Sequence, residues 1–213
     1  YLPAGTDGKT SEASLRQALA LKACVDIISA ALTASTFETL NQVDAHPTVM
    51  LVSRTNIAYG LTLENFKSRL VDILEMTSKA RKNQLTRFID VVTVHGSKGR
   101  EANTVIILDA TDRQFPKIHS DNLLFQLLGV TPLKVLDEER RLFYVAITRA
   151  RHQLCVLTEK GIESPYLEIL GRHGDPIREQ NCAESEGQIP VGRLALAIKS
   201  KIASLNLATE SKP

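Results

Sequence analysis

Residues 137–158, DEERRLFYVAITRARHQLCVLT, are the stretch of the sequence that decides the fold. Three acidic residues open it, and acidic groups are favoured at a helix start because the first amides are unpaired and the helix dipole is positive there. The apolar residues that follow predict a helix buried on most sides, and residues 154–157 predict a buried strand. The stretch therefore predicts a buried helix that leads directly into a buried strand.

An arginine ends the apolar face of this predicted helix. Leu142, Val145, Ala146 and Arg149 fall on one stripe at a period of 3.6 residues. A buried guanidinium needs an anion, because an unpaired buried charge is very costly. Physics alone leaves two interpretations of Arg149: a structural ion pair with Asp or Glu, or a phosphate ligand that uses the bidentate fork of the guanidinium.

The composition sets the class of protein. A chain of 213 residues with 43% hydrophobic residues fits one ordinary domain with an appendage. The formal charge of +2 excludes a strongly basic footprint, so any contact with DNA must be local. The three cysteines are scattered and the five histidines have no ligand-like spacing, which argues against a disulfide scaffold and a metal site.

The chain has no signal peptide and no run of about 18 apolar residues, so we expect a reducing, cytoplasmic setting. It begins at Tyr1 and not at methionine, which suggests a piece of a longer protein.

Three further apolar runs predict strands, at residues 49–53, 89–94 and 105–108. Apolar residues at helical spacing predict helices over residues 11–34 and 61–80, and the basic segment 81–87 is expected to be a connection. The second of the three strands runs directly into the turn His95-Gly96-Ser97-Lys98-Gly99. A glycine-rich turn at the carboxyl end of a strand is where parallel α/β sheets place ligands.

Three strings of the sequence resemble motifs of the UvrD/Rep-type superfamily 1 DNA helicases. EERRLFYVAITRA at 138–150 resembles motif VI, VTVHGSKGREANTVIIL at 92–108 resembles motif V, and a strand ending in SRTN at 53–56 resembles motif IV. The motifs occur in the family's order, and the resemblance covers roughly residues 48–170. It implies a RecA-like α/β domain, with three layers and a mainly parallel sheet flanked by helices, of the P-loop NTPase fold but without its own P-loop.

The resemblance also implies roles for single residues. Arg149 and Arg54 would act as catalytic arginine fingers on the ATP γ-phosphate, although a strand-end surface arginine is the alternative for Arg54. Glu101 would contact the ribose, beside Gly99. The remaining matched residues, implied to bind DNA or couple it to ATP, are His95, Ser97 and Lys98. The chain departs from the family's pattern at three positions. Ser53 stands where the family has an aromatic residue that stacks on adenine, and Arg100 and Ala102 stand where Leu and Phe are usual.

By this resemblance the chain is the second motor domain, called 2A, of an ATP-dependent 3′-to-5′ DNA helicase. Its partners would be single-stranded or partially duplex DNA and a first motor domain, which would hold the magnesium of the ATP. Residues 57–90 leave no room for the large 2B subdomain, as in the compact helicase IV branch. We expect three parts: a turn and helix at 1–47, the core at 48–170, and a polar linker with a terminal helix at 171–213.

Two other functions stay open. Gly8-Lys9-Thr10 resembles the end of a P-loop, so a self-contained NTPase could use Lys9 with Asp109, which follows the predicted strand at 105–108. A P-loop, however, has a glycine where this chain has Pro3, and no apolar strand precedes it. The second alternative is a module that binds nucleic acid or a protein partner and has no motor activity.

Overall fold

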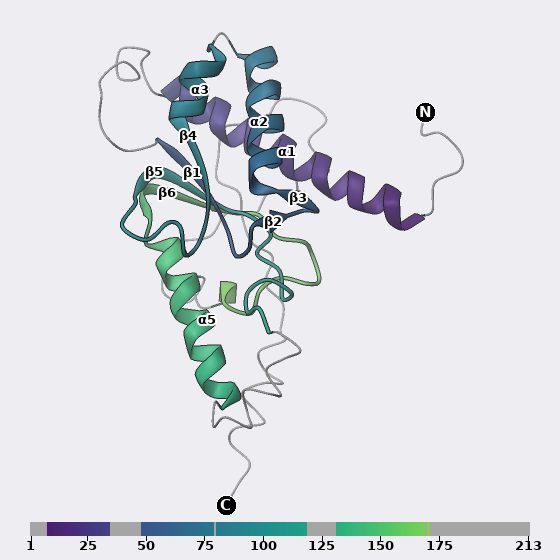
Figure 1. Cartoon of the computed structure of the whole chain (residues 1–213), viewed down its shortest axis with the longest axis vertical. Helices are drawn as coiled ribbons and strands as arrows, with labels where there is room; N and C mark the ends of the chain where they lie inside the picture. The colour runs from purple at the N-terminus through teal and green to yellow at the C-terminus, as the bar shows by residue number, and fades with distance from the viewer. Residues whose placement is uncertain (1–7, 35–47, 79, 119–130, 169, 171–213) are drawn as a thin grey trace, which may run out of the picture.

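The computed structural model describes residues 8–34, 48–78, 80–118, 131–168 and 170. Within these residues a four-stranded sheet has the order β4-β1-β5-β6, and every neighbouring pair is parallel. Its strands are β1 (Val49–Ser53), β4 (Ile89–Thr93), β5 (Ala102–Ile107) and β6 (Ala150–Val156). The predicted parallel α/β sheet is therefore confirmed (Figure 1). β5 and β6 both begin earlier than predicted.

Strand β1 lies in the interior of the sheet and is buried along its whole length. Val49 and Leu51 pack into one hydrophobic cluster, whereas Met50 and Val52 pack into a second. The alternation follows from the period of two residues that a strand imposes. A strand covered on both faces is a continuous apolar run, which is why the sequence predicted it correctly.

Helices form the two outer layers (Figure 1). α1 (Gly8–Ala34), α2 (Leu63–Thr77) and α3 (Lys82–Phe88) contribute to the cluster on one face of the sheet. α5 (Pro132–Ile147) contributes to the cluster on the other face. A small antiparallel hairpin, β2 (Ile57–Ala58) with β3 (Leu61–Thr62), joins β1 to α2.

Helix α5 differs from its prediction in where it begins and in how deeply it is buried. It begins at Pro132, with the Thr131 side chain accepting from the Lys134 amide. Threonine at the N-cap and proline in the first turn are strong start signals, so the acidic residues 137–139 lie beyond the first turn. The helix is also not buried on most sides, since Tyr144 is 63% exposed.

Two other expectations need a correction or fall outside the description. The basic segment expected as a connection forms the short helix α3, whose Leu85 and Phe88 are buried in the core. The linker and terminal helix predicted for 171–213 lie outside the described residues. So do residues 1–7 of the predicted N-terminal part, 1–47.

Two positions on α2 test this packing. Leu74 is completely buried and Met76 is 86% exposed, although both lie in the last turns of the same helix. We expect Leu74→Ala to lower the free energy of unfolding by about 2–5 kcal/mol, because it removes buried methyl groups and leaves a cavity. Met76→Ala should change it by about 0.5 kcal/mol or less. Urea denaturation of the two variants checks this, and equal losses would contradict the described core.

Candidate functional site

The parallel sheet decides which candidate residues share an edge. All strands point the same way, so their carboxyl ends meet at one edge and their amino ends at the other. Arg54 follows β1 and His95 follows β4, so both lie at the carboxyl edge. Glu101 precedes β5 and Arg149 precedes β6, so both lie at the amino edge. The structure therefore does not bring Arg54 and Arg149 together.

Arg149 is held at the amino edge by uncharged oxygens. Its Nε donates to the Val145 carbonyl at 2.9 Å, one turn back in α5. Its two terminal nitrogens donate to the Arg100 carbonyl and the Thr148 hydroxyl, each at 3.3 Å. Among the described residues these bonds reach no carboxylate, so the structural ion pair finds no support at Arg149. The guanidinium is fixed in place, and its charge is available to an anion.

Glu101 lies beside Arg149. The Ala102 amide donates to the Arg149 carbonyl at 3.0 Å, which aligns the starts of β5 and β6. The Glu101 carboxylate accepts from Arg151 Nε at 2.9 Å, and both side chains are nearly half exposed. A surface pair of this kind contributes little to stability, so it leaves Glu101 accessible to another partner.

The turn after β4 connects the two edges. It begins beside β1, where the Val94 amide donates to the Ser53 carbonyl at 2.9 Å, and it ends at Glu101. Ser97 is buried, and its hydroxyl donates to the Val94 carbonyl at 2.7 Å. Gly99 has φ +77°, a conformation that favours glycine. Ser97 therefore shapes the turn, whereas the side chains available to a ligand are the exposed ones, His95 and Lys98.

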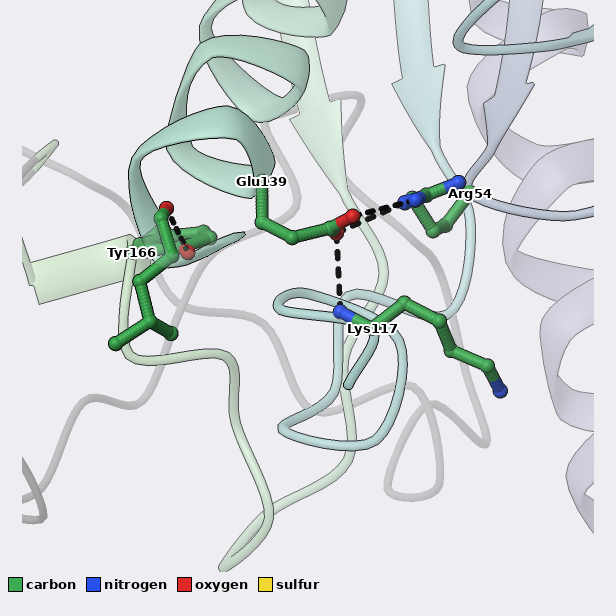
Figure 2. Close-up of polar contacts among 5 residues, drawn as sticks. Arg54, Lys117, Glu139 and Tyr166 are labelled. Carbon is green, nitrogen blue, oxygen red and sulfur yellow. Dashed lines mark hydrogen bonds and ion pairs between the residues drawn. The ribbon is translucent and has the colours of Figure 1, made fainter. Parts of the chain in front are cut away.

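At the carboxyl edge Arg54, which is largely buried, forms an ion pair with the buried Glu139 (Figure 2). Its Nε and Nη2 donate to the two carboxylate oxygens of Glu139 at 2.9 and 2.5 Å. The side chains are only 15% and 7% exposed, so the interpretation of Arg54 as a surface arginine is wrong. The Lys117 amide donates to the same carboxylate at 3.0 Å.

Glu139 was missed by the sequence interpretation, but a signal for it exists. It lies on the same face of α5 as Phe143 and Ala146, which follow it at spacings of four and seven residues and are buried. A carboxylate on the apolar face of a helix needs a buried partner.

Asp109, the candidate for a self-contained NTPase, has partners within the chain. Its backbone has φ 53°, and its amide donates to the Tyr59 hydroxyl at 2.9 Å. Thr111 donates to its carboxylate at 3.3 Å. Burial raises the pKa of Asp109 above its usual value, and burial likewise raises the pKa of Tyr59 well above its own. Lys9 lies in the first turn of α1, and its side chain is outside the description.

The described part of the chain contains no helix long and apolar enough to cross a membrane. It also contains no group of His, Cys, Asp and Glu side chains that could hold a metal ion.

The sequence from 34 to 161 matches the family model of the UvrD-like helicase C-terminal domain. The chain belongs to this family. The resemblance to the UvrD/Rep-type helicases is thereby confirmed, and the parallel sheet between helical layers agrees with the RecA-like fold.

Relatives of this UvrD-like domain are bacterial DNA helicases. DNA helicase IV of Escherichia coli is 39% identical over 93 residues, which are 42% of this chain and 14% of that protein. A probable DNA helicase of Mycoplasma pneumoniae is 38% identical over 76 residues, or 36% of this chain and 13% of the relative. The putative ATP-dependent DNA helicase YjcD of Bacillus subtilis is 37% identical over 84 residues, which are 39% of this chain and 10% of that protein. The matched part thus spans at most 14% of the length of these three proteins.

The variant Asp109→Asn tests whether burial of the Asp109 carboxylate destabilises the folded protein. The pKa of Asp109 is raised in the folded state, so folding disfavours its ionised carboxylate. The protein therefore loses stability as the pH rises from the pKa of Asp109 in the unfolded state through its pKa in the folded state. Asparagine tolerates the positive φ and removes the charge. We therefore expect a higher melting temperature at pH 7, with the gain vanishing below about pH 4, near the unfolded pKa.

Thermal melts of wild type and Asp109→Asn from pH 3 to pH 8 measure this gain. A lower melting temperature of the variant at pH 7 would show that neighbouring cations stabilise the ionised form by more than burial costs.

Proposed function

We propose that this chain is the second motor domain, 2A, of an ATP-dependent 3′-to-5′ DNA helicase. In this proposal it supplies an arginine finger to an ATPase site shared with a first motor domain. The observation that carries the proposal is Arg149, whose fixed guanidinium bonds only to uncharged oxygens among the described residues and lies beside Glu101. The direction of movement and the first motor domain come from the family resemblance.

The chemistry of Arg149 follows from its position. A guanidinium that is already held in place can stabilise charge on the transferred phosphoryl group without reorganising during the reaction. The Val145 carbonyl on Nε fixes the plane of the group, and further N–H donors of the terminal nitrogens can reach a phosphate oxygen. Glu101 and Gly99 would contact the ribose, while the first motor domain would bind the phosphates and the magnesium.

Arg54 fits a second finger poorly. Strand β1 is 5 residues long, so its two ends lie about 16 Å apart at roughly 3.3 Å per residue. In addition, the fork of Arg54 donates to both carboxylate oxygens of Glu139 (Figure 2). The expectation that both arginines contact one γ-phosphate is therefore not supported by this geometry, and we assign the finger to Arg149.

The DNA-binding side of the domain would be the carboxyl edge. His95 and Lys98 are exposed in the turn that begins there and runs towards Glu101. A contact between this turn and single-stranded DNA would thus lie on the same short segment as the ribose contact. This continuity favours a motor domain over a module that only binds nucleic acid.

The chain by itself should have no significant ATPase activity. An arginine finger accelerates hydrolysis roughly 10³- to 10⁵-fold, but only for a nucleotide that other groups already position. Phosphate release by the purified chain measures this, with Lys9→Ala as the control. Turnover that disappears in Lys9→Ala would support the self-contained NTPase and contradict the shared site.

In the intact protein Arg149→Ala should lower kcat about a thousandfold while nucleotide binding survives. Arg149→Lys should restore little, since an ammonium cannot reproduce the planar fork. Arg140→Ala is the matched control, because Arg140 lies on α5, the helix that leads to Arg149, and is exposed. Steady-state ATPase assays and melting temperatures are measured on the same preparations. A lower melting temperature with kcat unchanged per folded molecule would make Arg149 structural.

A further inference from the structure

Helix α5 is attached to both edges of the sheet. In the middle of the helix, Glu139 pairs with Arg54 at the carboxyl edge. Just beyond its carboxyl end Arg149 lies at the amino edge, where it donates to the Arg100 carbonyl and its own carbonyl accepts from the Ala102 amide. Glu139 and the last helical residue, Ile147, are about 12 Å apart along the helix, at a rise of about 1.5 Å per residue, and Arg149 follows two residues later.

We propose that Glu139 is a positioning residue through which α5 couples the DNA-binding edge to the nucleotide-binding edge. The inference rests on the function proposed above and adds a role for Glu139, a residue within the string that resembles motif VI. Glu139 touches neither ligand in this scheme. It acts by fixing Arg54, and with it the carboxyl edge of the sheet, to the helix that carries Arg149.

The contacts of Glu139 make this attachment firm. Both oxygens bind the Arg54 fork, and one of them also accepts from the Lys117 amide (Figure 2). One carboxylate therefore holds three segments together: the end of β1, the segment after Pro116, and α5. Because separating a buried pair leaves an uncompensated charge, these segments should move together and not slide past one another.

The rest of the path is continuous. On the DNA side, Ser53 precedes Arg54 and accepts from the Val94 amide at 2.9 Å, directly before His95. On the nucleotide side, Phe143 and Ala146 are buried against the sheet, so α5 is packed along its length between the two attachments. A displacement of the His95 turn can thus reach Arg149 through a hydrogen-bonded and packed series, which is the physical basis that coupling requires.

The pair can be removed without leaving a buried charge. Replacing a buried ion pair by apolar side chains of similar volume is often neutral or stabilising, so Arg54→Met combined with Glu139→Leu should fold. Arg54→Lys is a second variant, which keeps the charge and removes the fork. Glu138→Gln is the matched control, since Glu138 neighbours Glu139 on the same helix and is exposed.

The measurement is the ratio of ATP turnover with and without oligo(dT) in the intact protein. In the double variant we expect this ratio to fall about tenfold, a size typical of coupling between two sites. In Arg54→Lys the ratio should fall by less, and in Glu138→Gln it should equal the wild-type ratio. An unchanged ratio in the folded double variant would overturn the proposal, because a merely structural pair predicts it.

Two further outcomes are distinguishable. An unchanged ratio with a much lower kcat, both with and without DNA, would mean that Arg54 acts on the phosphate directly and would also overturn the coupling role. Absence of ATPase activity in the intact wild-type protein would instead contradict the proposed function itself. Should the double variant fail to fold, Arg54→Lys decides, and a wild-type ratio in that variant counts against coupling.

Discussion

The parallel alignment of four strands around the buried strand β1 is the constraint on which the rest of the structure depends. β1 is hydrogen-bonded to β4 on one side and to β5 on the other, and its side chains alternate between two hydrophobic clusters. With the strands aligned, every strand-following segment reaches one edge and every strand-preceding segment reaches the other. The edge at which a candidate residue lies is thus decided by backbone pairing, before any side chain is considered.

Stability alone does not explain why Arg54 and Glu139 form an ion pair at this place in the fold. Taking two charges out of water can cost more free energy than their attraction returns, and an apolar pair can be as stable. What the ion pair adds is direction, because a side-on fork with two hydrogen bonds allows one arrangement of strand end and helix. Tyr166 packs against Phe143 and donates to the Leu136 carbonyl at 3.1 Å, so α5 is fixed by several oriented contacts.

The sequence predicted the strands well because strands buried on both faces are continuous apolar runs. The predicted start of α5 was wrong, because it was based on the acidic residues 137–139 and not on Thr131 and Pro132, which are the stronger start signal. It could not find the partner of Glu139, which is separated from it by 85 positions. The order of motifs likewise says nothing about sheet edges, so two arginines that seemed equivalent in sequence lie far apart in the fold.

Two routes join the edges, and they differ in stiffness. The turn from Val94 to Glu101 is short and largely exposed, and it is shaped by the left-handed Gly99 and the buried hydroxyl of Ser97. Such a segment can change conformation when a ligand binds its exposed side chains. α5 is a continuous helix, and its Phe143 and Ala146 are packed on the sheet. A soft turn beside a stiff helix allows local adjustment to one ligand while the distance between the edges stays fixed. A domain of this design would transmit the state of one edge to the other as a rigid movement of α5, and not as a gradual deformation of the sheet.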